Sequence, residues 1–173
     1  MALIKSVKGV KPVFGNNCFL ADNATITGDV VMGNDCSVWF NAVVRGDVHS
    51  IRIGNNVNIQ DGAIVHCTYQ KAPVSIGNNV SIAHNAIVHG CTIHDNVLIG
   101  MGAIIMDGAI INSNSIVGAG ALIKEGTIVE SGTVWAGVPA VKIRDIDQRL
   151  LEGQVNRISH NYNMYAGWYD KEE

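Results

Sequence analysis

Residues 93–135 read IHDNVLIGMGAIIMDGAIINSNSIVGAGALIKEGTIVESGTVW, with a large apolar residue at every sixth position. These positions are Ile93, Ile99, Ile105, Ile111, Val117, Ile123, Val129 and Trp135. Four places after each of the first seven comes a small or slim residue, and glycine, asparagine or aspartate lies between them. Such residues tolerate the backbone of a tight corner. The pattern therefore predicts short strands with a bend every six residues.

The same spacing extends upstream to Phe14, with insertions after Val44 and Val65. Three strands close a triangular coil of about 18 residues, and successive coils stack about 4.8 Å apart. Each coil buries its apolar side chains against the next coil. We therefore expect a mostly β hexapeptide solenoid over residues 10–140. The repeat resembles the left-handed parallel β-helix of the hexapeptide-repeat proteins.

The tail, residues 141–173, has a different pattern. Its apolar residues recur at helical intervals, beginning with Ile143 and Ile146 and ending with Tyr165. We expect a C-terminal α-helix, weakened at Gly153, that packs on the solenoid or on a neighbouring subunit. An amphipathic helix can also lie on a membrane, but the mixed charges of this one argue against a membrane partner.

Composition narrows the function classes. Only 16% of the residues are charged and the formal net charge is -3, so the basic excess that binds phosphate backbones is missing and nucleic acid is not an expected partner. We find no run of apolar residues long enough to cross a bilayer and no signal-peptide pattern at the start, and we expect a cytoplasmic protein. The four cysteines show no C-x-x-C spacing, so reduced thiols are expected.

Two histidines fall in one column of the predicted solenoid. On the third side of successive coils, the position after the apolar residue holds Arg45, His66 and His89. Coil stacking places His66 and His89 about 4.8 Å apart, near enough to share a metal ion. His84 falls on the second side, directly above Asp61, so its column cannot easily meet the other two within one chain.

Three motifs carry a specific resemblance: VVRGDV (43–48), NIQDGAIVHCT (58–68) and SIAHNAIVHGC (81–91) are similar to the γ-class carbonic anhydrase family. The resemblance implies a homotrimer that binds zinc, or alternatively iron or cobalt, between subunits. It implies that His66 and His89 come from one chain and His84 from the next. With three imidazole ligands, bound water has a pKa of about 7 and supplies metal-bound hydroxide, which suits a lyase that reversibly hydrates CO2 to bicarbonate.

The same resemblance implies roles for five further residues. Gln60 hydrogen-bonds the hydroxide or the product, and Tyr162 contributes from the tail helix. Arg45, Asp47 and Asp61 build a network at the subunit interface, in which Arg45 binds bicarbonate or a carboxylate and Asp61 orients a ligand. The alternative for Arg45 and Asp47 is a plain surface ion pair, which contributes little.

One departure from the family bears on activity. The best-studied members carry a proton-shuttling glutamate in the loop after the first ligand histidine, whereas the loop here, CTYQKAP (67–73), has no carboxylate. Val48 also replaces an acidic residue of those members. This predicts slow hydration, or proton transfer through a buffer or through His49.

Two other functions stay open. The segment WAGVPAVKI (135–143) resembles the end of the acyltransferase solenoid, so a hexapeptide acyltransferase or CoA thioesterase is one alternative. A non-catalytic metal-binding trimer is the other alternative.

The remaining histidines and cysteines are not expected to bind the metal. We expect His49, His94 and His160 to be polar surface residues. Cys67 and Cys91 flank the ligand histidines in the sequence but are expected to be bystanders, and Cys18 and Cys36 are expected to lie in the core.

Overall fold

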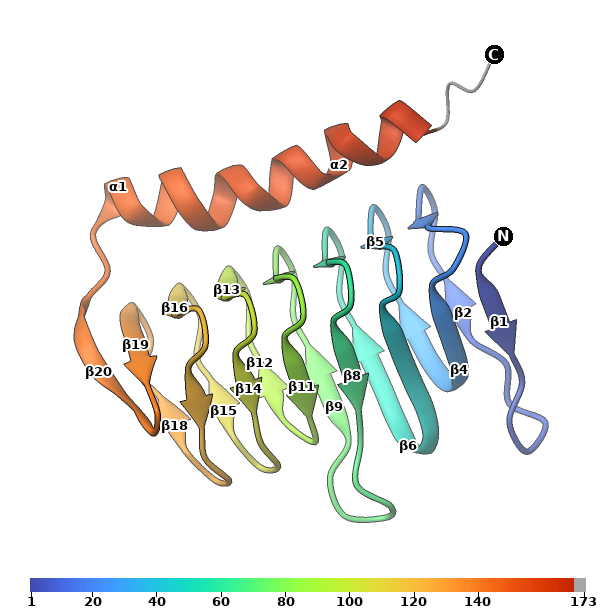
Figure 1. The fold of residues 1–173 in the computed structure, drawn as a ribbon, viewed down its shortest axis with the longest axis horizontal. Coiled ribbons are helices and arrows are strands. Elements are labelled where there is room, and N and C mark those ends of the chain that lie inside the picture. Colours follow the sequence, from blue (N-terminus) through green and yellow to red (C-terminus); the bar gives the residue numbers. More distant parts are fainter. Residues whose placement is uncertain (170–173) are drawn as a thin grey trace.

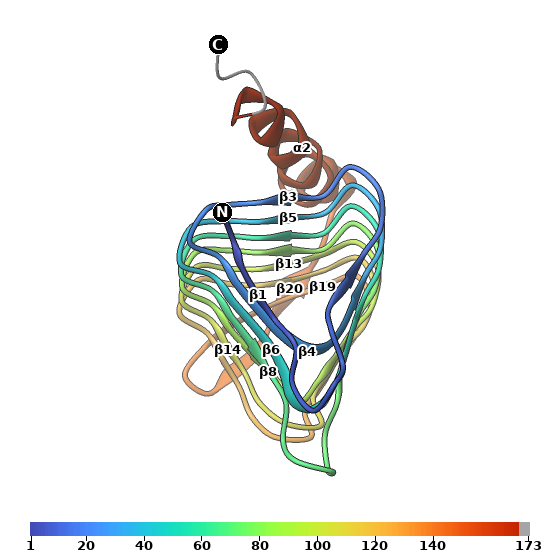
Figure 2. The same cartoon turned by 90° about the vertical axis from the view of Figure 1, so that its right-hand side faces the viewer.

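The six-residue repeat folds into a stack of coils. In a computed structural model, which describes residues 1–169, the coils form a parallel β-solenoid of about seven turns, and a single helical segment runs along one side of the stack (Figure 1). Viewed along the stack, each coil has a roughly triangular outline (Figure 2). The predicted left-handed parallel β-helix with a C-terminal helix is confirmed.

The strands belong to two sheets. The first, of twelve strands, contains β1 (Leu3–Lys5), β2 (Val13–Phe14), β4 (Thr25–Met32), β6 (Val43–Ile53), β8 (Ile64–His66), β9 (Val74–Ile76), β11 (Ile87–His89), β12 (Thr92–Ile93), β14 (Ile104–Ile105), β15 (Ile110–Ile111), β17 (Leu122–Ile123) and β18 (Ile128–Val129). The second, of eight strands, contains β3 (Phe19–Leu20), β5 (Ser37–Val38), β7 (Asn58–Ile59), β10 (Ser81–Ile82), β13 (Val97–Ile99), β16 (Ser115–Val117), β19 (Thr133–Gly137) and β20 (Ala140–Asp145).

The core is the column of apolar residues that the repeat predicts. Ile82, Ile99 and Ile105 are 0% exposed, as are the small residues Ala86 and Ala103 that follow four places after an apolar position. Strands of successive coils pair in parallel, with Ile82 opposite Ile99. Because every coil buries the same positions, apolar burial and backbone pairing stabilise the stack together.

An asparagine ladder lines one corner of the coils. Asn56, Asn79, Asn96 and Asn114 all have positive φ, between 54° and 59°. The side-chain amide of each of the first three donates to the side-chain carbonyl of the next, over 2.7, 3.1 and 3.1 Å. Asparagine tolerates this left-handed backbone and satisfies its own polar groups along the stack, so the corner residues help to set the register.

The first insertion lengthens strands instead of forming a loop. β4 and β6 continue past a corner, with Gly28 opposite Gly46. A Cβ at Gly28, whose φ is +76°, would lie 2.3 Å from the carbonyl oxygen of Gly46, so only glycine allows this close approach. The second insertion forms the protruding loop 67–73 between β8 and β9 (Figure 1).

The C-terminal helix begins later than its apolar spacing predicts. Residues 140–145 form β20, which pairs antiparallel with β19, so the assignment of Ile143 to the helix is wrong. The last coil leaves the edge of β19 open, and β20 satisfies its backbone groups. The helical segment consists of α1 (Gln148–Leu150), the π-helical η1 (Leu151–Asn156), which contains Gly153, and α2 (Arg157–Tyr169). The last four residues of the predicted tail, 170–173, lie outside the described residues.

The helix packs on the second sheet of its own chain. Val155 and Ala166 are buried, and Tyr162 meets Trp39 edge to face at 5.1 Å. The side chain of Asn56 donates to the hydroxyl of Ser159 over 2.6 Å. The helix therefore contacts the solenoid of its own chain. Within residues 1–169, no helix has the length and apolar character needed to span a bilayer.

The core position Ile99 provides a test of this packing. Replacing Ile99 by alanine is expected to lower the free energy of unfolding by about 2–5 kcal/mol, because the side chain is 0% exposed and leaves a cavity. Ile128→Ala is the matched control, since Ile128 is 59% exposed and its loss should cost less than about 0.5 kcal/mol. Urea unfolding at one fixed protein concentration measures both. Equal losses would contradict the assigned core.

Candidate metal centre

The predicted column of Arg45, His66 and His89 is present. Arg45 is opposite His66 in the pairing of β6 with β8, and His66 is opposite His89 in the pairing of β8 with β11. The two imidazole rings have centroids 5.1 Å apart. Nδ1 of His66 lies 3.1 Å from Nε2 of His89. One nitrogen of each histidine therefore points at the same small volume.

This separation suits a shared metal ion. Two nitrogens bound to one tetrahedral zinc at 2.0–2.1 Å lie about 3.3 Å apart. The observed 3.1 Å needs only a small adjustment. Imidazole nitrogen is also a preferred ligand of zinc, iron and cobalt. The two histidines thus fit a divalent ion, and one chain supplies half of a four-coordinate site.

Two carboxylates hold the opposite nitrogens of these rings. Nε2 of His66 lies 3.2 Å from Oδ1 of Asp47, and Nδ1 of His89 lies 2.5 Å from Oδ1 of Asp107. A carboxylate on the far nitrogen fixes the tautomer and the orientation of a ligand histidine. Both rings are therefore held so that their free nitrogens face each other.

Asp107 is the site residue that the sequence reasoning missed. Besides the contact with His89, its carboxylate accepts a hydrogen bond from the hydroxyl of Thr68. Burial raises the pKa of Asp107, but the hydrogen bonds from Thr68 and His89 outweigh burial and leave the pKa below its ordinary value. The carboxylate is thus ionised at neutral pH, as an orienting group for a ligand histidine should be.

Gly90 makes room for this carboxylate. A Cβ at Gly90 would lie 2.5 Å from Oδ1 of Asp107 and 2.8 Å from Cβ of Ala72, and its φ is +52°. Any larger residue would push Asp107 away from His89. A glycine directly after a ligand histidine, one coil from an aspartate, is the sequence signal that could have revealed Asp107.

Removal of Asp107 is expected to weaken metal binding. In Asp107→Ala, His89 loses the group that orients it, so metal affinity should fall about 10–100-fold. Competition with a chromophoric chelator measures the affinity. Glu125→Ala is the matched control, because Glu125 pairs only with the exposed amine of Lys71, at 3.2 Å. An unchanged affinity in Asp107→Ala would show that His89 needs no such support.

His84 lies apart from the pair, as predicted. It follows β10, and its Nδ1 lies 3.0 Å from Oδ2 of Asp61 in the coil below. Its Nε2 lies 3.4 Å from the hydroxyl of Tyr162. Burial, and then the charge of Asp61, raise the pKa of Tyr162 to about 12, so this hydroxyl keeps its proton. His84 thus has one ring nitrogen on a carboxylate and the other beside a phenol.

Gln60 and the tail helix meet His84 in a cavity. The cavity has a volume of about 430 Å³ and lies between the second sheet and the helix. Its polar lining includes Gln60, His84 and Tyr162, and apolar side chains such as Leu98 and Ile116 complete it. Gln60 is buried and donates to the side-chain carbonyl of Asn58 over 2.9 Å. Gln60 and His84 of one chain therefore line the same cavity.

Arg45 and Asp47 form an ion pair at 2.6 Å. Burial raises the pKa of Asp47, but the hydrogen bonds from Arg45 and His66 outweigh it, and the pKa lies below its ordinary value. Burial, and next the charge of Arg45, lower the pKa of His66, which keeps a neutral imidazole ready for a metal. Because Asp47 contacts both neighbours, the RGD segment is linked to the candidate ligand and is more than a surface ion pair.

A complete ligand set is not assembled by the described chain. Within residues 1–169, no group of three or more His, Cys, Asp or Glu side chains is placed to hold a metal ion. In this part of the chain no hydrogen bond links His84 to His66 or to His89. The third ligand must come from another subunit if the three histidines bind one ion.

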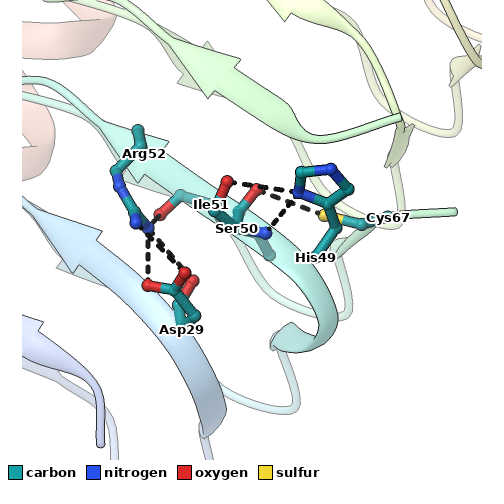
Figure 3. Close-up of polar contacts among 6 residues, drawn as sticks. All are labelled: Asp29, His49, Ser50, Ile51, Arg52 and Cys67. Atoms are coloured by element: carbon teal, nitrogen blue, oxygen red, sulfur yellow. Dashed lines mark hydrogen bonds and ion pairs between the residues drawn. The ribbon is translucent and has the colours of Figure 1, made fainter. Parts of the chain in front are cut away.

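The other histidines and cysteines near the site lie in different settings. His94 and His160 are exposed, as predicted. His49 is partly buried, and its Nδ1 accepts from the backbone N–H of Ser50 over 2.8 Å, next to the Asp29–Arg52 ion pair (Figure 3). The Cys67 thiol donates to the carbonyl of Ser50 over 3.5 Å (Figure 3), which leaves Cys67 outside the candidate ligand set.

Comparison with known proteins identifies relatives over nearly the whole chain. The family model "Bacterial transferase hexapeptide (six repeats)" matches residues 11–46 and 90–125. "Carbonic anhydrase" of Geobacillus kaustophilus is 40% identical over 96% of this chain and 91% of its own. "Protein YrdA" of Escherichia coli is 34% identical over 98% of this chain and 93% of its own. "Gamma carbonic anhydrase 1, mitochondrial" of Arabidopsis thaliana is 38% identical over 90% of this chain and 57% of its own.

A solved structure shares the whole architecture. The crystal structure of a hexapeptide transferase family protein from Anaplasma phagocytophilum matches with a TM-score of 0.92 and 37% identity. The match covers 96% of this chain and 98% of that one. The architecture is thus shared with a hexapeptide transferase family protein.

Proposed function

Because the chain belongs to the γ-class carbonic anhydrase-like family of hexapeptide-repeat proteins, we propose that it is a metalloenzyme that reversibly hydrates CO2 to bicarbonate between subunits of a homotrimer. The observation that carries the proposal is the pair of imidazole nitrogens 3.1 Å apart, each ring held by a carboxylate. This arrangement prepares two ligands for one ion and leaves the third to another chain.

We propose that His66 and His89 of one chain and His84 of the next hold the ion. Zinc is the first candidate, and iron or cobalt would accept the same ligands. When bound, such an ion lowers the pKa of its water ligand to about 7 and provides a nucleophile at neutral pH. Asp47 and Asp107 each hold one ring nitrogen of a histidine, which keeps the opposite nitrogen available. Asp61 holds Nδ1 of His84, and Tyr162 would have to release Nε2 of His84 for that nitrogen to bind the ion.

The chain's other residues provide the substrate environment. Gln60 and Tyr162 line the cavity beside His84, where an amide and a protonated phenol can orient bicarbonate oxygens. Arg45 uses Nη1 for Asp47, and the remaining N–H groups of its guanidinium suit an anionic product. We assign product binding to Arg45 and orientation to Gln60 and Tyr162.

Proton removal is expected to limit the rate. The loop 67–73 has no carboxylate, and within it Thr68 is engaged with Asp107 and Lys71 pairs with Glu125. We therefore expect the hydration rate at saturating CO2 to rise with imidazole buffer concentration at constant pH and ionic strength. Stopped-flow measurements test this. A rate independent of buffer would mean that an internal group, such as His49, already carries the proton.

The function itself is tested by metal analysis beside stopped-flow CO2 hydration on the same purified protein. The proposal predicts about one ion per chain and hydration that is lost with a chelator and regained with metal. Stoichiometric metal without hydration would instead support the alternative of a non-catalytic metal-binding trimer. Neither metal nor hydration would reject the site.

Acyl transfer or thioester hydrolysis is the second candidate. It is favoured by the cavity of about 430 Å³ beside His84, which is far larger than CO2 requires and has several apolar walls. The 37% identity to a hexapeptide transferase family protein agrees with this reading. Release of free CoA thiol from short acyl-CoA substrates, measured without added metal, would support this function over hydration.

A further inference from the structure

Two cysteines lie one above the other at the N-terminal end of the solenoid. Cys18 directly precedes β3 and Cys36 directly precedes β5, and the first residues of these strands, Phe19 and Ser37, pair in register. The backbone N–H of Phe19 donates to the carbonyl of Cys36 over 2.9 Å. Parallel neighbours lie about 4.8 Å apart, inside the Cα separation of 4.4–6.8 Å found in disulfides. The backbone spacing therefore already suits a disulfide.

The two thiols also have equivalent surroundings. Cys18 Sγ donates to the carbonyl of Gly33 over 3.2 Å, and Cys36 Sγ donates to that of Gly54 over 3.2 Å. The neighbouring Cys36 side chain is the largest influence on Cys18 and lowers its pKa to about 6, whereas Cys18, and then burial, raise the pKa of Cys36. The two side chains therefore influence each other across the strand pair, and the negative charge is favoured on Cys18.

Cys18 is the accessible member of the pair. Cys36 is 1% exposed, whereas Cys18 is only partly buried. Both line a cavity of about 330 Å³ between the first coils and the end of the tail helix, which Asn163 and Gly167 close from the other side. A small molecule from solvent meets Cys18 first.

The other two thiols are enclosed. Cys67 and Cys91 are 1% and 2% exposed, and neither lines the cavity beside Cys18. They therefore provide an internal reference for the reactivity of Cys18.

We propose that Cys18 and Cys36 form a peroxide-sensitive dithiol that closes to a disulfide and ties the first two coils together. The Cys18 thiolate attacks one oxygen of hydrogen peroxide, which breaks the O–O bond, gives a sulfenic acid and releases hydroxide. Cys36 then loses its proton and attacks the Cys18 sulfur, which forms the S–S bond and releases a second hydroxide. With two protons the products are one disulfide and two waters, so two thiols are oxidised by one peroxide.

Peroxide treatment of the full-length protein tests the proposal. All four cysteines are free thiols, so alkylation after denaturation should count four before treatment and two afterwards. The intact mass should fall by about 2 Da, and peptide mapping should find Cys18 linked to Cys36. Four thiols remaining at peroxide concentrations that oxidise exposed thiols would overturn it, and so would a link through Cys67 or Cys91.

Variants separate the two steps. Cys36→Ser should stop at the Cys18 sulfenic acid, which dimedone traps, whereas Cys18→Ser should not react with dimedone at all. Gly167→Leu gives a test that leaves both cysteines intact, since a Cβ at Gly167 meets no atom within 4 Å. A side chain there should fill the cavity and slow oxidation roughly 10-fold, because thiol reactivity follows access. An unchanged rate would mean that oxidant does not enter by this cavity.

Discussion

Purified His89→Ala protein is expected to contain almost no bound metal, compared with about one ion per chain in the parent. Loss of His89 removes one imidazole and also leaves Nδ1 of His66 without the nitrogen that faces it at 3.1 Å. Two remaining histidines from different chains cannot enclose an ion tightly. Metal content by plasma mass spectrometry after dialysis against a weak chelator measures this effect, and CO2 hydration should fall with it by at least about 100-fold.

The control for this experiment is His94→Ala. His94 is exposed and directly follows β12, outside the column of Arg45, His66 and His89, so its loss should change neither metal content nor hydration. The fold should survive in both variants because neither side chain belongs to the core. Full metal content in His89→Ala would reject the candidate centre, whatever the activity of the protein.

The coil register could be predicted because the repeat alone sets it. His66 and His89 are 23 residues apart, more than one coil, yet the apolar positions show that the loop 67–73 absorbs the excess. The placement of His84 above Asp61 follows from the same count and is observed as a 3.0 Å contact. Column geometry therefore gave both halves of the candidate ligand set.

Asp107 was missed for a physical reason. In the next coil, the residue that stacks on His89 is Met106. Asp107 is one position farther along the chain and stacks on Gly90 instead. Its side chain reaches His89 diagonally, across the space that the glycine leaves. A count of apolar positions describes which residues are stacked, but it does not describe such diagonal side-chain contacts.

The start of the helix could not be predicted from its apolar spacing because two patterns overlap there. Ile143 and Ile146 fit a helical interval, but alternation also places Ile143 on a strand. The antiparallel pairing of β20 with the open edge of β19 decides between them, and that edge exists only once the solenoid is formed. Tertiary context thus overrides the local pattern.

Mixed trimers of His84→Ala and His89→Ala chains are expected to regain about a quarter of the parent's metal content, although each variant alone binds almost none. Each proposed site takes His66 and His89 from one chain and His84 from the next. At an interface where a His84→Ala chain supplies the pair and a His89→Ala chain supplies His84, every ligand is present.

The expected recovery of about a quarter of the metal content follows from closed threefold symmetry. Around any trimer that contains both variants, only one of the three interfaces has the intact combination. With equal amounts and random assembly, about three quarters of the trimers are mixed, so about a quarter of all sites are complete. Refolding the two variants together and measuring metal per chain tests this, with the separately refolded variants mixed afterwards as the control. Recovery in the joint sample alone requires a site shared between chains. A ligand set within one chain predicts no recovery, and full metal in His84→Ala by itself would remove His84 from the set.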